Sequence, residues 1–293
     1  MVGLAGCGKV AAQQPSDAAA DAAPDAALVC DPTAPLGPPM LLPGFASTTA
    51  NEFGARLSPD ELTIYVVANL PGGKGGHDLY MAQRSSLHEP FGALMPLTAL
   101  NSTAEEYDPT VSADGLTLVF ASNRVTGEGF HLYVSTRRST LSVFEQPSLL
   151  SGVAAPTATN NDLEPFLTAD GKELWFASDR SSNYDLYRAA WIGSGFANPQ
   201  VVGELNTSAN ELDPTLSADR LTVYFSRAGQ SIDIWTAHRT TVVDGFPTPT
   251  PVPVLDTTAD DRPNWLSPDS CRLYLMSTIT TTWDVYIATR QPQ

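Results

Sequence analysis

A segment of about fifty residues recurs five times along this chain. Its first landmark is a turn aspartate, and successive turn aspartates lie 54, 56, 49 and 50 residues apart: Asp60, Asp114, Asp170, Asp219 and Asp269. A second landmark, built around an aromatic residue, ends each segment with spacings of 53, 54, 48 and 51: Asp78-Leu79-Tyr80, His131-Leu132-Tyr133, Asp185-Leu186-Tyr187, Asp233-Ile234-Trp235 and Asp284-Val285-Tyr286. Two independent landmarks therefore share one period, and the chain must fold as a repeated unit.

The segment from Glu105 to Ser135 predicts three β-strands. Asp114-Gly115 is a pair that tight hairpins favour, because both residues tolerate positive φ. Leu116 to Ser122 alternates large and small side chains, which is the period of a strand. A fourth segment that begins with Phe links successive repeats: Phe91 to Leu100, Phe144 to Ala154, Phe196 to Leu205 and Phe246 to Leu255. An all-β unit of this length and number predicts a five-bladed β-propeller of four-stranded antiparallel blades.

The last repeat lacks a fourth strand, and the N-terminal part of the chain supplies a candidate for it. Leu36 to Phe45 precedes a polar loop, Ser47 to Glu52, that matches the loops following the other fourth segments. Closing the ring with both chain ends removes exposed sheet edges. We therefore assign residues 1–42 to an N-terminal remnant and tether, and residues 43–293 to the propeller.

The repeats resemble the WD40-like units called PD40, which occur in TolB and related cell-envelope propellers. The third repeat shows the pattern best: Glu164-Pro165, Thr168-Ala169-Asp170-Gly171, Ser178-Asp179-Arg180 and Asp185-Leu186-Tyr187. The resemblance covers about residues 43 to 290 and implies the propeller fold. TolB also has an α/β domain and six blades, which this sequence does not show, so the resemblance does not imply the role of TolB in the Tol-Pal system.

The N-terminal residues resemble a bacterial lipoprotein signal. Leu4-Ala5-Gly6-Cys7 matches a lipobox, whose cysteine is lipidated in that family, although a charged and an apolar region do not precede it. Gly8 to Pro39 is rich in Ala, Pro and Asp and is expected to be a flexible tether. The resemblance implies a periplasmic or outer-membrane-anchored protein, and the alternative is a disordered tail without an anchor.

If Cys7 is lipidated, Cys30 and Cys271 are left as a pair. Cys30 precedes the first strand and Cys271 follows the last turn, so ring closure would place both in one blade. A disulfide fits an oxidising compartment. Two unrelated thiols are the alternative.

The net charge of −16 argues against a nucleic-acid partner and against electrostatic docking on anionic lipid. No stretch is long and apolar enough for a membrane-spanning helix. Contact with a membrane is therefore expected only through a lipid anchor, and we expect a monomer.

An acidic residue stands eight positions before each turn aspartate: Glu52, Glu106, Asp162, Glu211 and Asp261. Ring geometry is expected to gather these five acids around one mouth of the central channel, where they would bind a cation such as Ca²⁺ or hydrogen-bond neighbouring amides. Repetition in every blade favours the structural role. Arg124, Arg180 and Arg227 end second strands and are candidate partners for the acids.

The sequence contains no catalytic motif that we recognise, and a lone His131 in place of an anchor aspartate has no nucleophile beside it. The loops before the first and third strands of each repeat share one face and vary most, so binding is expected there. We expect a non-catalytic envelope propeller, without a cofactor, that binds a protein, peptide or glycan. The alternatives are a glycoside hydrolase of the arabinanase type, whose propeller carries three carboxylates, and a purely structural module.

Overall fold

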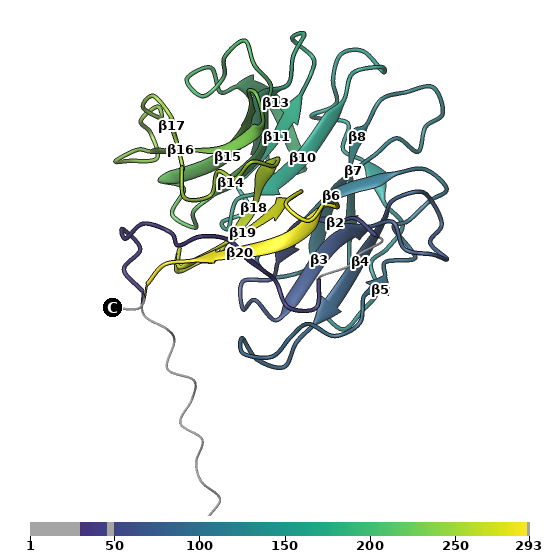
Figure 1. Cartoon of the computed structure of the whole chain (residues 1–293). Coiled ribbons are helices and arrows are strands. Elements are labelled where there is room, and N and C mark those ends of the chain that lie inside the picture. The colour runs from purple at the N-terminus through teal and green to yellow at the C-terminus, as the bar shows by residue number, and fades with distance from the viewer. Residues whose placement is uncertain (1–29, 46–49, 292–293) are drawn as a thin grey trace, which may run out of the picture.

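The computed structural model describes residues 30–45 and 50–291, and these form five antiparallel sheets of four strands around a central axis (Figure 1). Blade one contains β2 (Glu52–Leu57), β3 (Thr63–Ala68), β4 (Asp78–Gln83) and β5 (Met95–Pro96). Blade two contains β6 (Glu106–Val111), β7 (Thr117–Ser122), β8 (His131–Thr136) and β9 (Ser148–Leu149). Blade three contains β10 (Asp162–Leu167), β11 (Glu173–Ser178), β12 (Asp185–Trp191) and β13 (Phe196–Val201).

Blade four contains β14 (Glu211–Leu216), β15 (Thr222–Ala228), β16 (Ile232–His238) and β17 (Thr250–Pro251). Blade five contains β18 (Asp261–Leu266), β19 (Arg272–Ser277), β20 (Asp284–Thr289) and β1 (Met40–Leu41). The first strand of each blade lies nearest the axis in Figure 1. The prediction of a five-bladed, four-stranded propeller is confirmed.

The turn aspartates fix the hairpin between the first and second strands. Asp114 accepts hydrogen bonds from Ser112 Oγ at 2.6 Å and from the backbone N–H of Leu116 at 2.9 Å. Gly115 adopts a φ of +71°, which a residue without Cβ takes at little cost. In each of the other four turns, a serine or threonine two positions before the aspartate donates the equivalent hydrogen bond to it. Repetition of these residues is therefore explained by turn geometry alone.

Both ends of the chain complete the ring. Met40 and Leu41 of β1 pair with Ile287 and Tyr286 of β20, and Leu36 bridges Arg290. Cys30 and Cys271 form a disulfide with a Cα–Cα distance of 5.8 Å. Residues 30–42, which were assigned from the sequence to the tether, therefore pack on blade five.

The hydrophobic core lies between blades. Tyr65 and Leu79 of blade one pack with Leu118 and Phe120 of blade two in one buried cluster. Tyr274 of blade five belongs to a cluster with the core of blade one. Each blade therefore buries its faces only when a neighbour stands on each side, so stability depends on an intact ring.

Hydrogen bonds also join neighbouring blades on both sides of the ring. On one side, the backbone N–H of Glu106 donates to the carbonyl of His77 in the preceding blade at 3.0 Å, and the same bond recurs elsewhere around the ring. Near the hairpin turns, Arg137 donates from Nη2 to Tyr65 Oη of the preceding blade at 2.9 Å. Arg84 makes the same contact with Tyr274 across the junction of blades one and five.

No helix in residues 30–45 and 50–291 is long and apolar enough to cross a membrane.

Deleting residues 1–46 is expected to destabilise the propeller, because blade five loses β1, the disulfide and the buried side chains of Leu36, Leu42 and Phe45. A fully buried side chain of this size contributes about 1.5–3 kcal/mol, so the loss is large against a typical stability of roughly 5–15 kcal/mol. Thermal melting measures it, with a deletion of residues 8–28 as the control that keeps Cys30 and β1. Equal melting temperatures for the two truncations would contradict this closure.

Candidate functional site

The five acids singled out in the sequence each begin an inner strand and are buried: Glu52, Glu106, Asp162, Glu211 and Asp261. Glu106 shows how such a carboxylate is held. It accepts hydrogen bonds from the backbone N–H of Ser102 at 2.9 Å, from Ser122 Oγ at 2.9 Å and from Arg124 Nη2 at 3.1 Å. All three donors belong to blade two or to the loop that leads into it.

The same arrangement recurs in the next two blades. Asp162 accepts from the Ala155 N–H at 2.9 Å and from Arg180 at 2.6 Å. Glu211 accepts from the Thr207 N–H at 2.9 Å and from Arg227 at 2.7 Å. The pairing of Arg124, Arg180 and Arg227 with these acids is confirmed.

Asp261 in blade five accepts from the N–H of Thr257 at 2.8 Å and from its hydroxyl at 2.8 Å. Within residues 30–45 and 50–291, no group of three or more His, Cys, Asp and Glu side chains is placed to hold a metal ion. Ca²⁺ binding by the five acids stays a prediction, which melting with Ca²⁺ and with EDTA decides.

A different set of acids, which the pattern of repeated residues did not indicate as a site, faces the channel. Asp108, Glu164 and Asp213 stand two positions after the strand-initiating acids of blades two, three and four, and all three are buried. Each has a φ between +52° and +55° and lies at a shift in strand register, which marks a β-bulge. The bulge departs from simple alternation and redirects these side chains.

The three channel acids form one network with two arginines. Arg262 Nη1 lies 3.2 Å from Glu164 Oε1 and 3.4 Å from Asp213 Oδ2. The backbone N–H of Asp213 donates to Glu164 Oε2 at 2.7 Å, and Ser226 Oγ donates to Asp213 Oδ2 at 2.5 Å. The second arginine, Arg56, is also buried, and its Nη1 donates to Thr215 Oγ1 at 3.2 Å.

Burial changes the protonation behaviour of this network. Burial is the main cause that raises the pKa of Asp108 to about 7, and the negative charge of Asp213 adds to the rise. The positive charges of Arg56 and Arg262 oppose it. Burial and the charge of Asp213 also raise the pKa of Glu164. Burial lowers the pKa of Arg56 to about 10. Two of the three acids therefore bind protons more tightly than exposed carboxyl groups do.

Aromatic side chains surround the mouth of the channel above these acids. The residues that precede third strands contribute four rings: His77, Phe130, Tyr184 and Trp283. The residues that follow the strand-initiating acids contribute Phe53 and Tyr107. Phe53 and Tyr107 meet edge to face with centroids 5.5 Å apart, and Tyr107 stacks on Phe130 at 4.9 Å. All six are partly exposed. We call these six residues the aromatic collar.

A cavity of about 360 Å³ opens between the collar and the acids. Phe53, Tyr107 and Trp283 form part of its wall, and Asp108 and Glu164 also line it. Because the collar residues lie at the start of first strands or just before third strands, the cavity lies on the face where the variable loops were expected to bind. Half-exposed aromatic rings above a few convergent polar groups are typical of ligand sites.

The remaining candidates from the sequence have structural contacts. The anchor aspartates hold the loops before them, as Asp78 does by accepting from the backbone N–H of Lys74 at 2.5 Å. His131, which replaces that aspartate in blade two, lies with Nε2 3.2 Å from Glu128 Oε2. Cys7 lies outside the described residues.

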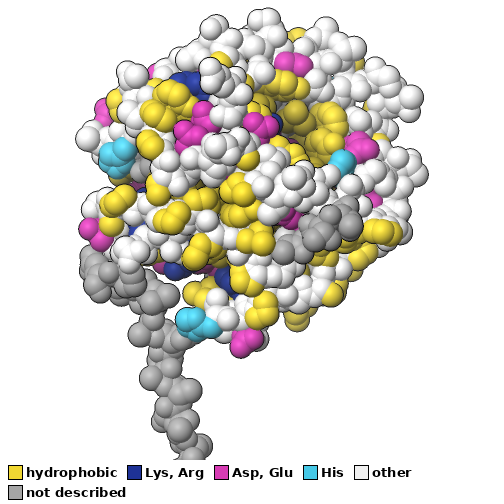
Figure 2. Space-filling model, in the orientation of Figure 1, with side chains coloured by type: hydrophobic (Ala, Val, Ile, Leu, Met, Phe, Trp, Pro, Cys, Tyr) yellow, Lys and Arg dark blue, Asp and Glu magenta, His cyan; other side chains and the backbone are white. Residues whose placement is uncertain are grey.

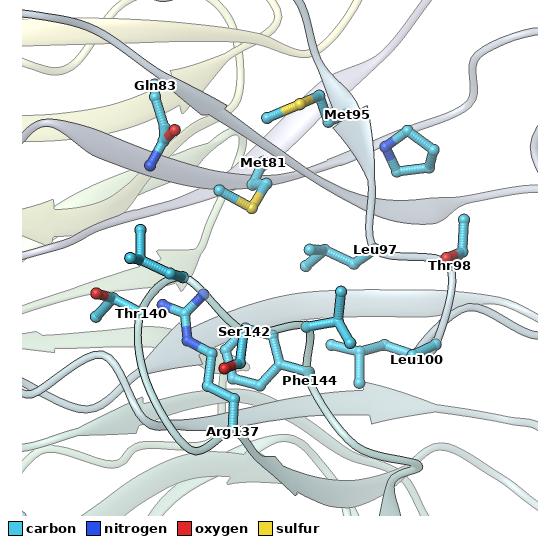
Figure 3. A pocket seen from close by; sticks show the side chains of 14 residues that line it. Met81, Gln83, Met95, Leu97, Thr98, Leu100, Arg137, Thr140, Ser142 and Phe144 are labelled. Carbon is cyan, nitrogen blue, oxygen red and sulfur yellow. The ribbon is translucent and has the colours of Figure 1, made fainter.

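A second hollow, of about 320 Å³, lies between blades one and two (Figure 3). Its wall is mainly apolar and includes Met81, Leu97 and Phe144. Arg137 in this wall is already bonded to Tyr65 Oη. This hollow lacks the acids that make the channel mouth chemically distinctive.

Comparison with known proteins identifies the fold without a family. No protein-family model and no curated protein sequence matches the chain. Among solved structures, TolB from Acinetobacter baumannii is similar, with 18% identity and a TM-score of 0.51 over 82% of this chain. The match covers 54% of that TolB chain, so this chain spans about half of it.

Two glycoside hydrolases are similar over nearly their whole length. A thermostable family-43 glycoside hydrolase matches with 13% identity and a TM-score of 0.57, over 87% of this chain and 98% of the hydrolase. An α-L-arabinofuranosidase from Podospora anserina, solved with cellotriose, matches with 12% identity and a TM-score of 0.53, over 90% of this chain and 99% of the arabinofuranosidase. At these identities the likeness shows the propeller fold alone.

The raised pKa of Asp108 predicts a stability that depends on pH. The folded protein keeps this proton up to about pH 7, whereas an unfolded aspartate loses it near its ordinary pKa of 3.8. The folded state therefore binds more protons between these values, and the free energy of unfolding falls as pH rises through the range. Asp108→Asn should reduce the fall between pH 5 and pH 8 by roughly 2 kcal/mol.

Denaturant unfolding at several pH values measures this effect. Asp114→Asn is the matched control, because it changes a turn aspartate of the same blade whose pKa is lowered by its hydrogen bonds with Ser112 and Leu116. Glu164, Asp213, Arg56 and Arg262 face Asp108 from other blades and stay in place in both variants. An unchanged slope in Asp108→Asn would refute the assignment.

Proposed function

We propose that the protein is a non-catalytic binding propeller that takes part of a protein, peptide or glycan into the channel mouth. The observation that carries the proposal is the aromatic collar above a cavity of about 360 Å³. Partly exposed rings supply large contact areas with little loss of side-chain freedom on binding. The polar groups at the cavity floor supply orientation.

The contacts of the channel acids favour binding over hydrolysis. In a glycoside hydrolase, one carboxyl group must reach the leaving oxygen while a second acts on the opposite side of the sugar. Here Glu164 is occupied by Arg262 and by the Asp213 N–H, and Asp213 by Arg262 and Ser226. These bonds commit two of the three carboxylates to the network.

Hydrolysis is the second candidate, because one observation favours it. Three buried carboxyl groups come from successive blades, and two of them have raised pKa values, as a general acid requires. The similar glycoside hydrolases include an α-L-arabinofuranosidase. An assay with 4-nitrophenyl α-L-arabinofuranoside tests this alternative, and hydrolysis that Glu164→Gln abolishes would replace our proposal.

Arrays of bacterial envelope glycans and of peptides test the binding function. Wild-type protein should bind a subset of spots, and Trp283→Ala should weaken that binding at least tenfold, because a ring of the cavity wall is lost. Trp191→Ala is the matched control, since Trp191 is 50% exposed near the end of β12 and does not line the cavity. Melting curves for each variant exclude unfolding as the cause. Equal loss in both variants, or no binding by wild type, would refute the proposal.

We also propose that the protein works in the bacterial cell envelope. The Cys30–Cys271 disulfide supports this location, because such bonds persist in oxidising compartments. A lipid on Cys7 would anchor it there. When the chain is expressed behind a complete lipoprotein signal peptide that ends at Cys7, the protein should partition into the membrane fraction and Cys7→Ser should release it. Identical fractionation of the two forms would refute the anchor.

A further inference from the structure

The charges at the floor of the channel mouth do not balance. Three buried carboxyl groups, on Asp108, Glu164 and Asp213, face two buried or nearly buried guanidinium groups, on Arg56 and Arg262. When all five groups are ionised, the network carries one negative charge in excess. A buried charge without a partner is costly, so a ligand that supplies one positive charge would gain free energy there.

Of the three acids, Asp108 is the one that lacks a close positively charged partner. Arg262 lies within salt-bridge distance of Glu164 and Asp213, and Arg56 donates to Thr215. In the part of the chain that the structure describes, no Lys, Arg or His nitrogen lies within 4.0 Å of the Asp108 carboxylate. Asp108 accepts a backbone hydrogen bond from Glu164 and lines the open cavity. It is therefore the acid that a ligand can reach and neutralise.

The cavity wall also favours a cation. The faces of aromatic rings carry partial negative charge and attract ammonium and guanidinium groups. Trp283 already contacts a cation, since the guanidinium carbon of Arg262 lies 5.3 Å from its ring centroid. Phe53 and Tyr107 line the same cavity, and their ring centroids are 5.5 Å apart. A neutral sugar would also pack on these rings but would supply no cationic partner for Asp108.

Arg262 also lines the cavity, and it and Arg56 offset only part of the rise in the pKa of Asp108, so they do not supply the whole of the missing charge. At the rim, His77 is 2.7 Å from Glu105, so this histidine already has an acidic partner. The whole chain has a net charge of −16, and acidic side chains recur across the face in Figure 2. A surface of this sign attracts a positively charged ligand and speeds its encounter.

We propose that the channel-mouth cavity binds an alkylammonium group, which packs against Phe53, Tyr107 and Trp283 and pairs with the Asp108 carboxylate. This inference rests on the proposed binding function and narrows its ligand class. The group can belong to a small molecule with a quaternary ammonium or to a lysine side chain of a peptide or protein. Both present the same chemistry, an aliphatic chain that ends in one positive charge.

Calorimetric titration with matched probes tests the inference. Choline represents the quaternary ammonium, and 3,3-dimethylbutan-1-ol is its uncharged isostere. Nα-acetyl-lysine methylamide represents a lysine side chain. At least one of the two ammonium probes should bind. If choline binds, its affinity should be at least tenfold higher than that of its uncharged isostere. Which ammonium probe binds identifies the source of the group.

Proton linkage gives a second readout. Because a bound cation favours ionised Asp108, affinity at pH 8 should exceed affinity at pH 5.5 at least tenfold, and binding near pH 7 should release a proton to the buffer. Asp108→Asn should weaken ammonium binding at least tenfold and remove most of the pH dependence. Asp114→Asn should leave both unchanged. If Asp108→Asn does not fold, the comparison of ammonium probe with neutral isostere on wild type decides.

The outcomes separate this inference from the proposed function. Array binding that depends on Trp283, with no binding of either ammonium probe, would leave the binding function standing and overturn the ammonium ligand. Measurable and equal affinity for choline and its neutral isostere, without binding of the lysine probe, would overturn it as well. Ammonium binding that is insensitive to Asp108→Asn would place the cation elsewhere and refute the site. Absence of binding to both the arrays and the probes would overturn both proposals.

Discussion

The acid that begins each inner strand determines how the blades are joined. Glu106 illustrates this: its carboxylate holds the loop before it and Arg124, while its backbone N–H donates to the preceding blade. One residue therefore connects a loop, a strand end and a neighbouring blade. A charged carboxylate with several donors tolerates burial well. The carboxylates of Glu106, Asp162, Glu211 and Asp261 all hold the loop before them, so the repetition of this acid in blades two to five follows from a structural role.

Because these acids hold the scaffold together, the carboxyl groups that a ligand can reach in the channel come from other positions of the repeat. They come from the bulge, two residues later. Glycine occupies this position in blade one as Gly54, with a φ of +63°, and Asp108, Glu164 and Asp213 occupy it in the next three blades. Pro263 stands there in blade five. The backbone thus provides an equivalent position in blades one to four, where the side chains are free to differ, whereas Pro263 of blade five pairs with Leu275 and the register shift follows it.

Much of the fold follows from the sequence because its causes are local. Turn aspartates, alternating strands and the missing fourth strand of the last repeat are visible in the residue order, and they predict five blades closed by both chain ends. The bulge was missed because strict alternation places positions 106 and 108 on the same face. The available signal was an acid followed by proline, as in Asp108-Pro109, Glu164-Pro165 and Asp213-Pro214. Proline cannot donate to a strand ladder, so it marks an interruption.

The aromatic collar was missed for another reason. Its members stand at two different positions of the repeat, and only the ring closure makes them neighbours. Arg262 likewise contacts Glu164 from 98 positions away. Contacts across an axis depend on tertiary geometry, which the spacing of repeats predicts only in outline.

The disulfide also determines how the propeller responds to mechanical load. A pull on the chain before Cys30 reaches the fold first at the sulfur atoms and passes to Cys271, between the last turn and β19. The two-residue strand β1, held by hydrogen bonds and by the packing of Leu41, lies beyond that bond and carries little of the force. Blade five would therefore resist tension through a covalent link, while reduction would transfer the same tension to β1 and peel it from the ring.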